Sequence, residues 1–259
     1  MEILGIDVGG SGIKGAPVDI TTGEFTQERH KILTPQPATP DAVTNTIAEI
    51  VKHFNWEGKP LGCTFPAVIK HGVAYTAANV DDSWIGINGE ALVKEKTGCP
   101  TLFINDADAA GIAEMKLGAG KDHEGIVILH TLGTGIGSAI FVEGTLVPNT
   151  EFGRLLIPAP ESDDNVLSLK AYVGERWASS QIRKDEDLSW AKWAKRLNIY
   201  LKQMEAHFFP DLFIIGGGVS RKHEKFFQFL ELETEIVPAH FRNQAGIIGA
   251  ALAIADTLE

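Results

Sequence analysis

The sequence of 259 residues predicts an α/β fold built from two related halves. The first half alternates strands with helices, which is typical of α/β proteins. The expected elements are strands at 3–8, 13–20, 28–34, 61–69 and 101–104 and helices at 41–54 and 107–117. The order strand, glycine turn, strand then returns about 125 residues later, in the segment 126–142. Such a repeat indicates one structural unit used twice.

The second half is expected to continue with elements of both kinds. They are a strand at 145–148, a helix at 189–208, a strand at 212–215, a helix near 221–230 and a last helix at 245–258 that could pack back on the first half. Residues 158–186 are polar and include two prolines and an acidic run. They predict an irregular loop followed by a short helix.

Charge and cysteine content exclude several classes of protein. With 23 basic and 34 acidic residues the net charge is −11, which disfavours binding to nucleic acid. Cys63 and Cys99 form no Cys-x-x-Cys pair, so neither a zinc site nor a disulfide framework is expected, and both should be buried thiols. No apolar run reaches about 18 residues, and Met1–Val8 lacks a basic leader. We therefore expect no membrane partner and a cytoplasmic location.

The first glycine turn lies between two expected strands and runs from Asp7 to Lys14 through Gly9, Gly10, Ser11 and Gly12. Glycines let backbone N–H groups converge on phosphate oxygens, because a glycine adopts positive φ at little cost. A carboxylate at the end of a buried strand favours a metal or a hydrogen-bonded partner, and the lysine supplies a cation. A plain hairpin turn is the alternative.

Two further glycine turns follow. The turn with Thr131, Gly133, Thr134 and Gly135 is followed by a strand, which argues against a dinucleotide fingerprint, and the sequence has no P-loop motif. The turn with Gly217 and Gly218 leads from a strand toward an expected helix, so its N–H groups suit a phosphate chain. A tight strand-to-helix connection is the alternative there.

These three turns, with Asn105-Asp106 and Glu151-Phe152-Gly153, resemble the ROK family of sugar kinases, in particular its polyphosphate glucokinase (polyphosphate/ATP-glucomannokinase) subgroup. Further segments resemble that subgroup over nearly the whole chain: 64–67, 76–81, 130–135, 187–190 and 245–251. The resemblance implies an actin-like ATPase (ribonuclease-H-like) fold with two lobes around a central cleft. One lobe would comprise 1–113 with 247–259 as a returning helix, and the other 114–246. It also implies a homodimer.

The resemblance implies a role for each matching residue. Asp106 matches the catalytic base, while Asn79, Asn105 and Glu151 match sugar ligands. The donor-binding residues are those of the three turns: Asp7, Gly9, Gly10, Ser11, Gly12, Lys14, Thr131, Gly133, Thr134, Gly135, Gly217 and Gly218. Moving a phosphoryl group to a hydroxyl needs a base in hydrogen-bond reach and stabilised phosphate charge, which agrees with these roles. For Asn105-Asp106 a structural helix N-cap is the alternative.

The implied activity is transfer of a phosphoryl group from polyphosphate, ATP or both to the 6-hydroxyl of glucose or a related sugar. Mg²⁺ is expected at Asp7, directly or through water, and no zinc is expected because the family's cysteine cluster is absent. Arg154 stands where the family has a sugar-contacting histidine, and Leu155–Val166 departs from the glucokinase pattern. A catalytically weakened sugar- or phosphate-binding protein is therefore the alternative.

Basic residues on the expected helix 189–208 and beyond it allow two interpretations. They are Lys192, Lys195, Arg196, Lys202, Arg221, Lys222 and Lys225. They would form a track for polyphosphate, or they are the ordinary charged surface of a solvated helix. The sequence leaves the preferred donor and the exact sugar open.

Overall fold

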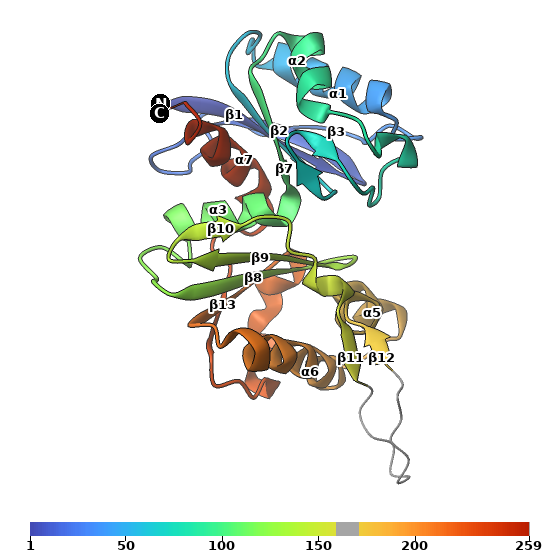
Figure 1. Ribbon diagram of the computed structural model, residues 1–259, viewed down its shortest axis with the longest axis vertical. Coiled ribbons are helices and arrows are strands. Elements are labelled where there is room, and N and C mark those ends of the chain that lie inside the picture. The colour runs from blue at the N-terminus through green and yellow to red at the C-terminus, as the bar shows by residue number, and fades with distance from the viewer. Residues whose placement is uncertain (159–170, 259) are drawn as a thin grey trace. The chain divides into compact units, whose positions relative to one another are not determined.

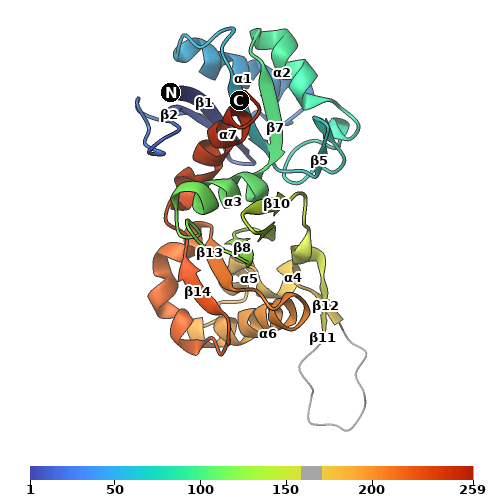
Figure 2. The same ribbon diagram turned by 60° about the vertical axis from the view of Figure 1, so that its left-hand side comes forward.

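The computed structural model describes residues 1–158 and 171–258, which form two compact units. Unit 1 comprises Met1–Gly118 and Asn243–Glu259, and unit 2 comprises Ala119–Arg242. The first segment of unit 1 ends just after helix α3 (Asp106–Leu117). Figures 1 and 2 show the elements of each unit from two directions.

Unit 1 is built on a five-stranded sheet in the order β3-β2-β1-β4-β7. Its strands are β1 (Glu2–Gly9), β2 (Gly12–Asp19), β3 (His30–Ile32), β4 (Leu61–Phe65) and β7 (Thr101–Asn105). The first three strands are antiparallel, whereas β4 and β7 run parallel to β1. Strand β4 ends earlier than the expected residue 69, because Pro66 has no N–H to donate to the ladder.

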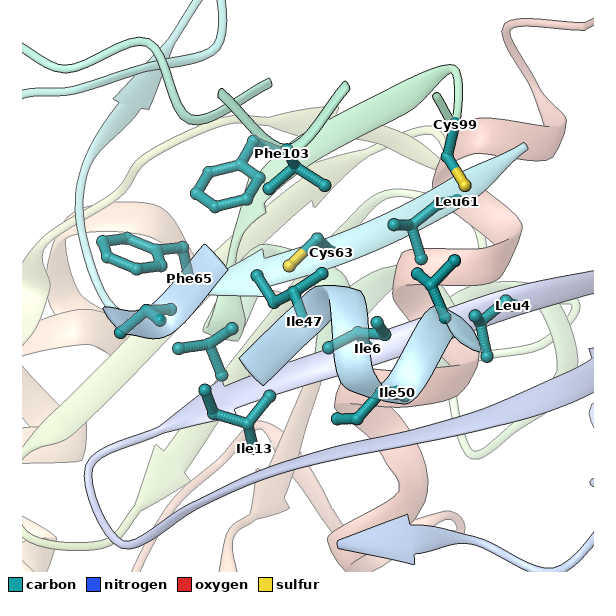
Figure 3. Packing of buried hydrophobic residues seen from close by; sticks show 14 of the residues in the cluster. Leu4, Ile6, Ile13, Ile47, Ile50, Leu61, Cys63, Phe65, Cys99 and Phe103 are labelled. Carbon is teal, nitrogen blue, oxygen red and sulfur yellow. The ribbon is translucent and has the colours of Figure 1, made fainter. Parts of the chain in front are cut away.

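Helices α1 (Pro40–His53) and α2 (Gly89–Thr97) belong to one layer of unit 1, and α1 packs its apolar face on the sheet. Alternate strand residues point toward this layer, among them Leu4, Ile6 and Cys63 (Figure 3). Cys63 and Cys99 are buried free thiols, as the sequence predicts, and burial raises the pKa of Cys63. The other residues of β1 and β4 therefore face the opposite side of the sheet.

Helix α7 (Ala245–Ala255) packs its backbone directly against that opposite face. A Cβ atom on Gly5 of β1 would collide with the carbonyl of Ile247, and one on Gly62 of β4 would collide with that of Ala250. On its other flank α7 meets α3, where a Cβ on Gly249 would strike the Ala109 carbonyl. The close approach of α7 therefore requires glycine on both sides of the contact.

Unit 2 repeats the topology of unit 1, which confirms the predicted relation between the halves. Its sheet has the order β10-β9-β8-β13-β14, again with three antiparallel strands followed by two parallel ones. The strands are β8 (Ile126–Leu132), β9 (Ile136–Val142), β10 (Thr145–Val147), β13 (Leu212–Gly216) and β14 (Glu235–Pro238). Helix α6 (Trp190–Phe208) packs Trp193, Leu197 and Leu201 on one face of this sheet.

Two sequence expectations in unit 2 need correction. The segment 158–186 ends in short helices, α4 (Glu175–Ala178) and α5 (Ser180–Asp185), in line with the predicted helical end. It also contains strand β12 (Ala171–Val173), paired with β11 (Leu156–Pro158), which was not predicted. The helix expected near 221–230 is wrong, because Gly218–Lys225 and Phe227–Phe229 are 3₁₀ segments and Lys222 leaves the helical region. Neighbouring like charges at 221, 222 and 225 disfavour a regular α-helix there.

The remaining elements are short. Unit 1 also has the two-stranded sheet of β5 (Ile69–Lys70) and β6 (Val73–Ala74) and the 3₁₀ turn Asp82–Trp84. Unit 2 adds the 3₁₀ turn Phe152–Arg154, and Arg242–Gln244 forms a further such turn just before α7. Across residues 1–158 and 171–258, none of the helices combines the length and the apolar character needed to cross a bilayer.

The glycine contacts of α7 predict a large effect of one added methyl group. Gly62→Ala places a Cβ on the Ala250 carbonyl, so the sheet and helix must separate, at a cost of about 2 kcal/mol or more. Chemical denaturation measures this loss. Gly133→Ala is the matched control, because its Cβ would meet no atom within 4 Å. Equal stability of the two variants would contradict the close packing.

His130 of β8 predicts a pH-dependent stability. It is fully buried, its Nδ1 lies 3.4 Å from the Tyr200 hydroxyl, and burial lowers its pKa to about 3. In the unfolded chain this imidazole has a pKa near 6.5, so below that pH the unfolded chain binds a proton that the folded chain does not bind. This residue should therefore reduce stability by about 1.4 kcal/mol per pH unit as the pH falls below about 6.5.

Urea denaturation at several pH values tests this. The slope should be shallower in His130→Gln than in the wild type, and unchanged in His207→Gln, which alters an exposed histidine. An equal slope in all three proteins would show that His130 does not control the dependence.

Candidate active site

The first glycine turn closes the β1–β2 hairpin of unit 1. Gly9 and Gly12 are cross-strand partners, and Gly10 and Ser11 form the exposed tip. None of these glycines has a positive φ, so the turn, contrary to the expectation from the sequence, does not need glycine for its backbone conformation. Glycine is needed at position 10 because another segment packs closely against it, since a Cβ on Gly10 would lie 2.8 Å from the Cβ of Asn79. The turn and Asn79 therefore lie in contact.

Asp7 is held in place from two neighbouring strands. The Thr64 hydroxyl donates to its Oδ1 at 2.9 Å, and the Lys14 ammonium donates to its Oδ2 at 3.3 Å. Gly246, at the start of α7, lies against the same carboxylate, where a Cβ would be 3.2 Å from Oδ1. The cation expected from the sequence is thus present but already paired, and this pairing largely offsets its charge.

Asn105 caps the N-terminus of α3. Its Oδ1 accepts from the N–H groups of Ala107 and Asp108, and its Nδ2 donates to the carbonyl of Ala67 at 3.0 Å. Asn105 therefore acts as a helix N-cap. Asp106 is the first residue of the helix, is exposed, and accepts from the Ala107 N–H through Oδ1. Its carboxylate is presented at the surface of unit 1 beside the capped turn.

The two glycine turns of unit 2 lie against each other. Gly217, with φ of 77°, packs so closely that a Cβ would collide with the backbone of Leu132, next to Gly133. Thr131 is the register partner of Gly216 across β8 and β13. Gly133, Thr134 and Gly218 are exposed around this contact. The structure thus brings together the residues of unit 2 that were predicted to bind the phosphoryl donor.

Helix α5 supports the turn at Gly133–Gly135 from behind. The Ser180 hydroxyl donates to the Gly133 carbonyl at 3.0 Å, and the Gln181 N–H donates to the same oxygen at 3.1 Å. The Gly133 N–H in turn donates to the Gly135 carbonyl. The backbone of this loop is therefore fixed without any ligand.

Glu151 and Arg154 form an ion pair within unit 2. The guanidinium Nε lies 3.2 Å from Oε2 of Glu151, and both side chains are partly exposed. Ser138 of β9 fixes the segment, because its hydroxyl donates to the Thr150 carbonyl and accepts from the Phe152 N–H. The positive charge of Arg154 is thus balanced by the adjacent carboxylate.

Glu175 is a second acidic residue near Glu151, and the sequence did not predict it as a site residue. Its carboxylate lies over Gly135, where a Cβ would come within 2.5 Å of Oε2. Partial burial raises the pKa of Glu151, the Arg154 charge opposes that rise, and the Glu175 charge adds to it. Glu175 lies within the polar segment 158–186, where no sequence motif distinguishes it.

Three of the seven basic residues on and after α6 are already engaged in contacts within unit 2. Arg196 pairs with Glu186 at 2.7 Å and lies over the Trp177 ring, while Lys202 lies 3.8 Å from Glu231. Lys225 lies over the ring of Trp190. These contacts favour the interpretation as an ordinary helix surface. The divergent segment after Arg154 is described only through residue 158, and its positions 159–166 lie outside the described residues.

Comparison with known proteins identifies the family. The model of the ROK family matches residues 3–151. A polyphosphate glucokinase of Mycobacterium tuberculosis is 51% identical over 98% of this chain and 92% of its own length. One of Mycobacterium leprae is 47% identical over 96% of this chain and 74% of its own length.

Two crystal structures share the fold. The polyphosphate/ATP-glucomannokinase of Arthrobacter sp. strain KM has a TM-score of 0.89 and 44% identity, with 99% of each chain covered. A ROK family glucokinase of Streptomyces griseus, solved with glucose and AMPPNP, has a TM-score of 0.77 and 23% identity, with 97% of this chain and 98% of that chain covered. The fold is the actin-like ATPase fold of these kinases. The chain belongs to the ROK family.

Proposed function

We propose that this protein is a hexose kinase that transfers a phosphoryl group from polyphosphate, ATP or both to the 6-hydroxyl of glucose or a related sugar. One observation carries the proposal: a chain 51% identical to a polyphosphate glucokinase over 98% of its length keeps an exposed carboxylate at the N-terminus of α3. Such a carboxylate can accept the proton of an attacking hydroxyl.

In unit 1, Asp106 is the proposed general base. Its neighbour Asn105 has one amide hydrogen left after its capping and carbonyl bonds, which a sugar hydroxyl can accept. Asn79 is exposed in a left-handed conformation against the hairpin tip. Each of the two asparagines would orient a sugar hydroxyl. Such positioning lowers the activation barrier of phosphoryl transfer.

The donor phosphates are assigned to the glycine turns and to Asp7. Backbone N–H groups at Gly10, Ser11, Thr134 and Gly218 are presented on exposed segments. Mg²⁺ commonly uses one or two carboxylates together with substrate phosphates. Asp7 fits this pattern, since it is partly exposed and keeps lone pairs beyond its bonds to Thr64 and Lys14. Bound there, Mg²⁺ would neutralise phosphate charge.

In unit 2, Glu151 is the proposed sugar ligand, with Glu175 close enough to influence its charge. An ionised carboxylate accepts hydrogen bonds from sugar hydroxyls on both oxygens, whereas the protonated group turns one of these oxygens into a donor. Arg154 favours that ionised form but also binds one of the two oxygens of Glu151. The substitution of the family histidine therefore alters the sugar contacts without leaving a buried, unpaired charge.

Location and assembly complete the proposal. The buried free thiols Cys63 and Cys99 suit the reducing cytoplasm. A homodimer is expected from the family resemblance, and light scattering of the purified protein would measure it.

Removal of the base is the direct test of the proposed chemistry. Asp106→Asn keeps an oxygen for the Ala107 N–H but cannot take a proton, so kcat should fall by about 10²-fold or more while the unfolding midpoint is preserved. Coupled detection of the hexose phosphate measures this. Asp41→Asn is the control, since Asp41 is an exposed carboxylate in the first turn of α1. Equal activity of both variants would remove Asp106 from the mechanism.

The ion pair of Arg154 favours a second candidate function, a protein that binds sugar or phosphate with little turnover. Glu151 cannot offer both oxygens freely while Arg154 holds one of them. Calorimetry with glucose and with tripolyphosphate, followed by product analysis, separates the two functions. Binding without product in the wild type, with turnover gained by Arg154→His, would establish the second function and contradict the first.

The same pair predicts a shift in the pH profile. Arg154 lowers the pKa of Glu151, so Arg154→Gln lets that pKa rise, and Glu151 becomes protonated at a higher pH. The acidic limb of kcat/KM for the sugar should move upward by about half a pH unit. Arg29→Gln is the control, because Arg29 belongs to unit 1 and is distant in sequence from Glu151, so the acidic limb should stay in place. An unmoved or lowered limb in Arg154→Gln would contradict a role for ionised Glu151.

A further inference from the structure

Lys31 lies over the first glycine turn, although neither the sequence motifs nor the family roles include it. It belongs to β3 and is the cross-strand partner of Lys14 on β2. Its side chain extends along β2 to the hairpin, where a Cβ on Gly12 would collide with its Cε and lie 3.4 Å from its Nζ. The ammonium of Lys31 is therefore placed beside the turn assigned to the donor.

Three charged residues follow one another across the sheet on the face that α7 covers in part. Asp7, Lys14 and Lys31 occupy matching positions of β1, β2 and β3, because Asp7 pairs with Lys14 and Lys14 with Lys31. Asp7 offsets Lys14. In the part of the chain that the structure describes, no carboxylate lies within ion-pairing distance of Lys31.

This arrangement leaves one positive charge beside the turn in a chain whose net charge is −11. Like charges on directly paired strand positions destabilise a sheet, so folding alone does not favour two lysines there. A phosphate chain at the turn would supply the missing anion. Strand β3 is also the edge of its sheet, so no further strand limits a linear polyanion beyond Lys31.

We propose that Lys31 is a second phosphate-binding cation of the donor site and binds phosphate oxygens of the donor chain next to Gly12. The assignment rests on the proposed kinase function. Polyphosphate and ATP share the phosphate chemistry that Lys31 recognises. Measurements with each donor show which of them reaches Lys31.

The experiment compares Lys31→Gln and Lys31→Arg with the wild type. Loss of one exposed ionic contact should raise the donor KM about three- to tenfold at low salt, for one donor or both, with kcat changed by less than about twofold. Lys31→Arg should restore most of the affinity. The dependence of log KM on log salt should be shallower in Lys31→Gln, because fewer counterions are released.

Lys52→Gln is the matched control, since it removes an exposed lysine of unit 1 near the end of α1. Titration calorimetry with tripolyphosphate gives a readout that needs no turnover. A wild type that binds tripolyphosphate but transfers nothing would contradict the kinase proposal, and weaker binding by Lys31→Gln would still support the site. Wild-type affinity and donor KM in Lys31→Gln would overturn the role of Lys31.

Discussion

Helix α7 lies with its backbone against β1, β4 and α3, and the candidate groups of unit 1 depend on that contact. Gly5 and Gly62 leave room for it on the sheet, and Gly249 leaves room for α3. Helix α7 begins beside Asp7, and α3 begins with Asp106. Because α7 packs on both β1 and α3, it holds Asp7, the proposed donor-binding carboxylate, in a fixed position relative to Asp106, the proposed base. Side chains at these three glycines would move both carboxylates.

Strand register then determines the charge beside the glycine turn. The pairing of β1 with β2 places Lys14 on Asp7, and the pairing of β2 with β3 places Lys31 next to Lys14. The sequence motif predicts Lys14 as a phosphate-binding cation, whereas the structure pairs Lys14 with Asp7. Among the described residues Lys31 has no ion-pair partner. In unit 2, contact between two loops has a comparable effect, because Gly217 against Leu132 brings separate glycine turns together.

The long periodic elements and the repeated topology could be predicted from the sequence, because both depend on local patterns. Helix α2 was missed although Asn88 and Gly98 cap it, since its own residues are mostly polar. Glu175 and Lys31 could not be found from motifs. Their relation to Gly135 and Gly12 arises only when distant segments pack together. The capping role of Asn105, by contrast, was visible as an alternative from its residue type alone.

The proposed function is phosphoryl transfer to a hexose at a sugar site that contains Arg154. The ion pair with Glu151 balances the charge of Arg154, so this residue is compatible with a working site. A matrix of polyphosphate and ATP against a panel of hexoses, with the phosphorylated position identified by NMR, tests this most directly. We predict that at least one donor yields a hexose 6-phosphate. Folded protein that forms no sugar phosphate with any combination would contradict it.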